Sequence, residues 1–138
     1  MSARLRLLLV RGNAAYIGFF AFFGLIFDIR GVLYGLGPQG QILANAPLAG
    51  IGFIEAHGLA LILSVVLWRS TAVRGIHAVG VAMGLLLGVS NLAFWELFVS
   101  TDQIALGYVS TGLHLSFAVL QAIAFVSFGL RPRVQAYE

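Results

Sequence analysis

Four stretches of apolar residues run through this chain, each about as long as a helix that crosses a membrane, and only short breaks separate them. The stretches cover residues 14–35, 49–68, 76–98 and 107–130. Roughly 20 residues at 1.5 Å per residue cross the ~30 Å hydrocarbon core of a bilayer. With 60% hydrophobic and 9% charged residues, the chain could not cover a soluble surface with polar groups. The sequence therefore predicts an all-α, polytopic membrane protein, a single four-transmembrane-helix bundle over residues 1–138.

The arginines predict how this bundle is oriented. Seven of the eight lie in the breaks on one side of the four stretches: Arg4, Arg6, Arg11, Arg69, Arg74, Arg131 and Arg133. The positive-inside rule assigns that side to the cytoplasm, so both termini are expected to be cytoplasmic in a multi-pass protein of a cell membrane, such as a bacterial inner membrane. Arg30 lies on a bulky face and is expected to reach the outer headgroups. The basic charge thus indicates contact with a lipid bilayer, and no nucleic-acid partner is expected.

Two absent residue types restrict the chemistry. The chain contains no cysteine and no lysine. The lack of cysteine excludes disulfides, thiolate metal sites and thiol redox catalysis. The lack of lysine excludes Schiff-base chemistry. Any reaction would therefore depend on histidines, carboxylates and amides.

Each apolar stretch carries one polar residue at a similar depth: Asp28, His57, Asn91 and His114. Each lies roughly seven or eight residues from the outer end of its stretch, or about 10–12 Å at the helical rise. At 100° per residue, Asp28 continues a face of small residues, which predicts that it points into the bundle. Ionisable groups within a membrane are costly to bury and predict a functional site. We therefore expect these four residues to form one buried polar site in the outer half of the bilayer.

Two further stripes predict how the helices pack. Gly80, Gly84 and Gly88 recur every four residues, and this face is expected to pack against another helix. A polar stripe formed by Ser110, Thr111, His114, Ala118 and Gln121 should be buried in protein, because lipid cannot satisfy its hydrogen bonds. Glu55 lies nearly opposite His57 on its helix. Either the glycine face or the Glu55 face is expected to join copies of the chain in a homo-oligomer.

The favoured function is binding of, or chemistry on, a small lipophilic molecule. His57 or His114 would act as an acid or base, with Asp28 or Glu55 orienting or charging it. The expected ligand-binding residues are Asn91, Trp95, Glu96, Gln121 and Thr111. Whether any reaction is catalysed is left open.

Several alternatives fit the same residues. His57 and His114 lie at matching depth on helices that run in the same direction, as two axial ligands of haem b would require. A divalent metal held by Asp28, His57 and His114 is a variant of that idea. An oligomeric proton or ion conductor, or a structural membrane subunit, would suit the small size and Glu55. In the simplest alternative, a hydrogen bond between His57 and His114 ties the second and fourth stretches together, and Asn91 serves only packing.

Overall fold

A computed structural model describes residues 1–129 of the chain. These residues form six helices. The helices are α1 (Ala3–Tyr34), α2 (Gly37–Leu43), α3 (Ala49–Arg69), α4 (Arg74–Ala93), α5 (Trp95–Ser100) and α6 (Ile104–Val126). The four long helices α1, α3, α4 and α6 are long and apolar enough to cross a membrane, as in a multi-pass membrane protein. The predicted end of the fourth stretch at residue 130, with Arg131 and Arg133, lies outside the described residues.

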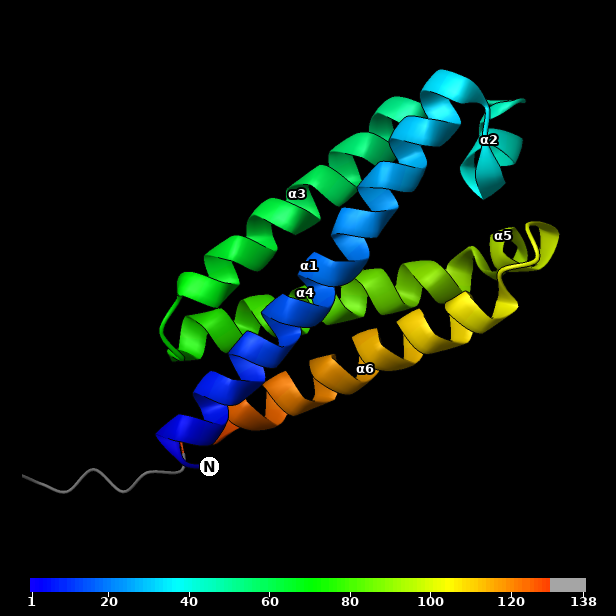
Figure 1. The fold of residues 1–138 in the computed structure, drawn as a ribbon. Coiled ribbons are helices and arrows are strands. Elements are labelled where there is room, and N and C mark those ends of the chain that lie inside the picture. The colour runs from blue at the N-terminus through cyan, green and yellow to red at the C-terminus, as the bar shows by residue number, and fades with distance from the viewer. Residues whose placement is uncertain (130–138) are drawn as a thin grey trace, which may run out of the picture.

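The long helices form two hairpins that diverge from one another. α1 packs along α3, and α4 packs along α6. Figure 1 shows the two hairpins close together near the N-terminus and wide apart where α2 and α5 lie. The order of a long, a short and a long helix occurs twice, in α1 to α3 and again in α4 to α6. At the end where the long helices diverge, α2 and α5 lie between the two hairpins (Figure 1).

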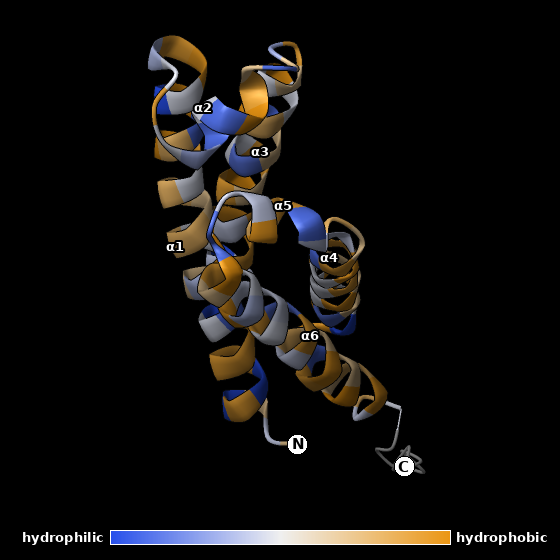
Figure 2. Cartoon of the chain, turned by 90° about the vertical axis from the view of Figure 1, so that its right-hand side faces the viewer, coloured by the Kyte–Doolittle hydropathy of each residue, from blue (hydrophilic) through white to orange (hydrophobic). Residues whose placement is uncertain are grey.

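The end at which the hairpins meet carries the arginines, and we call it the arginine end. Three guanidinium groups lie over aromatic rings of α3, of α6 and of the turn after α6: Arg6 over Phe128 at 4.1 Å, Arg11 over Trp68 at 5.0 Å and Arg74 over Phe125 at 4.3 Å. Cation–π contacts of this kind let long basic side chains cover apolar surface. Figure 2 shows the four long helices as mainly hydrophobic, with hydrophilic residues near their ends and on α2.

The glycine stripe of α4 forms the contact between α4 and α6 in the second hairpin. Gly80, Gly84 and Gly88 are buried against α6, where a Cβ at Gly84 would lie 2.7 Å from the carbonyl oxygen of His114. Small residues allow this close approach of two helices, so the expected packing of the stripe against a helix is confirmed. The partner helix belongs to the same chain, however. Of the two faces expected to join copies of the protein, the glycine face is thus covered by α6, and an oligomer through the Glu55 face stays a prediction.

Helix boundaries differ from the predicted stretches at two places. α1 begins at Ala3, where the side chain of Ser2 accepts a hydrogen bond from the backbone N–H of Leu5 at 3.2 Å and caps the helix. The third stretch, predicted to run to residue 98, divides into α4 and α5 at Phe94. α5 turns so that Phe98 packs over Gly107, where a Cβ would lie 2.8 Å from the ring.

Candidate functional site

A cavity of about 590 Å³ lies between the two hairpins. Seven phenylalanines contribute to its wall, namely Phe19, Phe20, Phe23, Phe27, Phe53, Phe94 and Phe98. Its polar groups come from all six helices or the loops beside them, and they include the four residues that the sequence places at one depth: Asp28, His57, Asn91 and His114. Ligand pockets of proteins commonly have this size and this mixture of apolar wall and few polar groups.

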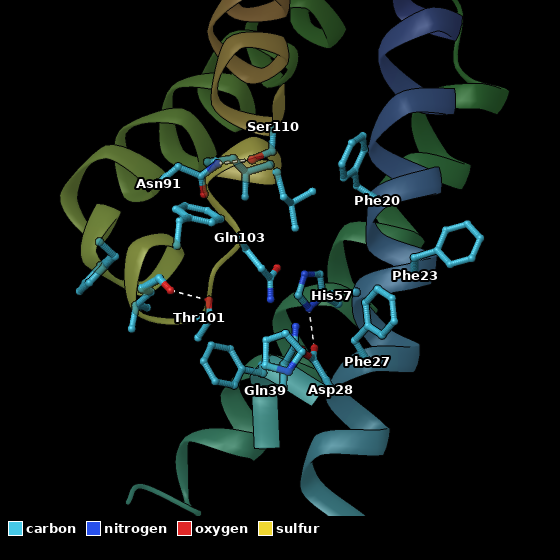
Figure 3. A pocket seen from close by; sticks show the side chains of 18 of the residues that line it. Phe20, Phe23, Phe27, Asp28, Gln39, His57, Asn91, Thr101, Gln103 and Ser110 are labelled. Carbon is cyan, nitrogen blue, oxygen red and sulfur yellow. Dashed lines mark hydrogen bonds and ion pairs between the residues drawn. The ribbon is translucent and has the colours of Figure 1, made fainter. Parts of the chain in front are cut away.

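The side chains of Asp28 and His57 are hydrogen-bonded to each other across the first hairpin. Oδ2 of Asp28 lies 2.5 Å from Nδ1 of His57. Asp28 is fully buried, which confirms that it faces inward, whereas 35% of the His57 side chain is exposed. The other carboxylate oxygen, Oδ1, is buried and has no hydrogen-bond partner among residues 1–129. Figure 3 shows His57 pointing down to Asp28 at the side of the pocket formed by α1 and α3.

The backbone of α1 makes room for this imidazole at Gly24. A Cβ at that position would lie 2.5 Å from Nε2 and Cδ2 of His57. Any larger residue would push the ring away from α1. The local sequence Gly24-x-x-x-Asp28 thus supplies a gap for the ring and, one helical turn later, the carboxylate that holds it.

His114 pairs with Tyr16 instead of with the other histidine. Its Nδ1 is hydrogen-bonded to the hydroxyl of Tyr16 on α1, and the Tyr16 ring stacks on Phe117 with 5.3 Å between centroids. The interpretation of His57 and His114 as a hydrogen-bonded pair is therefore wrong. His57 and His114 are thus both hydrogen-bonded to residues of α1, and this helix orients the two histidine rings that line the cavity.

Asn91 links the two helices of the second hairpin and also lines the cavity. Its Nδ2 donates to the hydroxyl of Ser110 at 3.0 Å. Figure 3 shows this pair on the far side of the pocket from Phe20, Phe23 and Phe27 of α1. Asn91 thus combines the packing role that the sequence allows with a place in the cavity wall.

The other predicted ligand-binding and catalytic residues lie outside the cavity wall. Thr111 and Gln121 are buried in the contact between helices, as expected for the polar stripe of α6, but neither lines the cavity. Trp95 packs against Phe98 and Tyr108. Glu55 and Glu96 are exposed. Arg30 is also exposed, as its bulky face predicts.

Three residues that the sequence interpretation passed over prove to be buried or in the cavity. His77 is fully buried, and its Nδ1 lies 2.5 Å from Oε1 of Gln121. Its spacing from Gly80 and Gly84 places it on the glycine stripe, and this signal could have identified it. Gln39 and Gln103 line the cavity from segments that were expected to be simple connections. No sequence pattern marks them, because their place depends on how the connections fold back.

The residues also bear on the metal alternative. Among residues 1–129, no three histidine, aspartate or glutamate side chains lie close enough together to hold one metal ion. Asp28, His57 and His114 therefore do not form the three-ligand site considered from the sequence.

Comparison with known proteins adds no relative: the chain matches no family model, and neither a curated protein nor a solved structure is detectably similar to it.

Proposed function

We propose that this protein binds a small lipophilic molecule in the cavity between its hairpins, with the polar group of that molecule against Asp28 and His57. The main support is the fully buried carboxylate of Asp28, one oxygen of which has no partner among the described residues although the residue lines a cavity. Buried polar atoms in proteins are nearly always hydrogen-bonded, and one left unpaired costs about 1–3 kcal/mol. A bound molecule that donates a hydrogen bond would remove that cost.

The wall of the cavity favours an elongated apolar body on the ligand. Phenylalanines line the cavity from α1, from α3 and from the α4–α5 region. Burying apolar surface yields about 25 cal/mol per Å². Such a ligand would gain affinity from its body and orientation from its polar group.

Under this proposal the arginine end is cytoplasmic and the cavity lies in the outer half of the bilayer. The five arginines Arg4, Arg6, Arg11, Arg69 and Arg74 lie at the starts of α1 and α4 and at the end of α3. The cavity lies toward the opposite end, beside α2 and α5. A lipophilic ligand would thus reach it from the outer leaflet or from outside the cell.

His57 is the residue that we propose would carry any reaction. Its ring is open to the cavity and is held by a carboxylate, and an imidazole oriented in this way is a suitable general acid or base. Asp28 would act as a positioning residue. Glu55 is not needed, because it lies on the exposed face of α3.

The test is to identify what the protein carries when it is purified. The full chain is isolated in a mild detergent, and the bound molecules are extracted and identified by mass spectrometry. We expect one small lipophilic compound near one molecule per chain, reduced at least tenfold in Asp28→Asn. Asp102→Asn is the matched control, since Asp102 is exposed and lies outside the cavity. Equal ligand content in both variants would contradict the proposal.

Haem b is the second candidate, because His57 and His114 line the same cavity from different hairpins. The Nδ1 atom of each ring is held by a residue of α1, as the second nitrogen of a haem-ligating histidine commonly is. Protein expressed with added haem would then show a Soret band that His57→Leu abolishes. A colourless protein would rule this candidate out.

A further inference from the structure

Phenylalanine is concentrated in the wall of the cavity far more than leucine, although both residues are common in the chain. Among residues 1–129, seven of the 11 phenylalanines line the cavity, against three of the 22 leucines, Leu87, Leu97 and Leu106. Both side chains are strongly apolar, so burial of apolar surface on a ligand would favour either of them to a similar extent. The wall therefore offers aromatic rings in particular, and not apolar surface in general.

Three of the seven phenylalanine rings have no aromatic partner. The other four take part in ring pairs, such as Phe19 with Phe23 at 4.9 Å between centroids. Phe27, Phe53 and Phe94 form no such pair with a ring of residues 1–129. Phe27 is 44% exposed and Phe94 is 63% exposed, although both line the cavity. Aromatic rings attract one another edge-to-face or in offset stacks, so a ring in the cavity would supply the contact that these three lack.

We propose that the cavity takes a flat, aromatic or conjugated ring system that carries a polar group, in preference to a saturated molecule of the same size. The proposal rests on the proposed function, since it specifies the apolar body of the ligand in the same cavity. Phe27 directly precedes Asp28, and Phe53 lies one helical turn before His57 on α3. The part of the ligand that adjoins its polar group would therefore contact two of the unpaired rings.

Two probes with one carbon skeleton separate ring contacts from the burial of apolar surface. Naphthalene-2-ethanol is flat and aromatic, and decahydronaphthalene-2-ethanol is its saturated analogue with the same hydroxyl. Binding to the full chain in lipid nanodiscs is measured by equilibrium dialysis, and empty nanodiscs correct for partition into lipid. A favourable ring pair strengthens binding roughly twofold to tenfold beyond the effect of buried area, so we expect the aromatic probe to bind about tenfold more tightly than the saturated one.

Substitutions of phenylalanine by leucine test whether the rings of the wall cause this preference. Phe27→Leu, Phe53→Leu and Phe94→Leu each keep an apolar side chain but remove a ring. We expect each to weaken binding of the aromatic probe roughly twofold to tenfold and to change binding of the saturated probe less than about twofold. Phe22→Leu is the matched control, since Phe22 is 49% exposed on the same helix as Phe27 but does not line the cavity. Asp28→Asn should weaken both probes alike, because it acts on their common hydroxyl.

The outcomes distinguish a wrong ligand class from a wrong site. Equal affinity for the two probes, or a preference that all three leucine variants retain, would overturn the flat ligand and leave the proposed function standing. A saturated molecule that co-purifies with the protein and is identified by mass spectrometry would do the same. A conjugated molecule that co-purifies would support the proposal even if neither probe displaces it. If neither probe binds and no molecule co-purifies, the proposed function is overturned as well.

Discussion

The imidazole of His57 lies against the backbone of Gly24, so that a Cβ at position 24 would stand 2.5 Å from Nε2. No side chain can be added there unless the ring moves. The ring is also held by Asp28, so its displacement would break the hydrogen bond between His57 and Asp28, which we place at the centre of the proposed site.

Gly24→Ala should therefore reduce the amount of ligand that co-purifies with the protein, while the protein stays folded. We expect at least a fivefold loss of the bound molecule, because the added methyl group displaces His57 from the cavity wall. Gly112→Ala is the matched control, since nothing lies within 4 Å of a Cβ at that position of α6. Mass spectrometry of the extracted ligand measures the effect. Wild-type ligand content in Gly24→Ala would contradict the described position of the ring.

The hydrogen bond between the buried side chains of His77 and Gln121 should contribute to the stability of the fold and should not affect ligand content. Both side chains are almost fully buried, with Nδ1 and Oε1 2.5 Å apart. Removing one partner leaves the other unpaired, so His77→Leu and Gln121→Leu should each cost about 1–3 kcal/mol. The double variant should cost less than the sum of the two. Thermal unfolding in detergent measures the cycle, and additive losses would show that the pair contributes nothing.

Gly84 is the position of the second hairpin where backbone meets backbone. A Cβ there would lie 2.7 Å from the carbonyl oxygen of His114 and 2.9 Å from Cβ of Ala118. Because a backbone atom cannot turn aside, Gly84→Ala should force α4 away from α6 and lower the melting temperature by several degrees. Gly75→Ala, at an open position at the start of α4, should not. A Gly84→Ala protein as stable as the wild type would exclude this helix contact.

A variant of Glu55 distinguishes the proposed binding function from the alternative of a proton or ion conductor. Glu55 is exposed on α3 and does not line the cavity. Glu55→Gln should therefore leave ligand content unchanged, and it should not alter any proton flux measured in liposomes with a pH-sensitive dye. A loss of ligand in this variant would place Glu55 at the site. A flux that depends on Glu55 would favour the conductor over the binding site.

The sequence predicted the helices and the central polar residues because both follow from simple periodicity. Apolar length defines the four long helices, and 100° per residue brings Asp28, His57, Asn91 and His114 to the wall of one cavity. The glycine stripe likewise predicted a helix contact. These features depend on the spacing of residues along one helix, which the sequence contains in full.

Contacts between helices were not predictable in the same way. That His114 would bond Tyr16, and His57 would bond Asp28, depends on side-chain rotamers and on the angle between helices. The close contact of Phe98 in α5 with Gly107 in α6 is a further example. Each of these contacts joins residues on two different helices. Hydrophobic periodicity describes positions along one helix, so it cannot predict which residues of two helices will meet.

The repeated order of long, short and long helix divides residues 1–129 into two hairpins, which are joined by the short connection at residues 70–73 and by contacts such as that of Tyr16 with His114. Neither hairpin encloses the cavity, because each supplies only one of its walls. Two polypeptides, divided at this connection and expressed together, would have to find one another in the bilayer before a binding site existed. Bound ligand would then be a direct measure of whether the fragments had recombined.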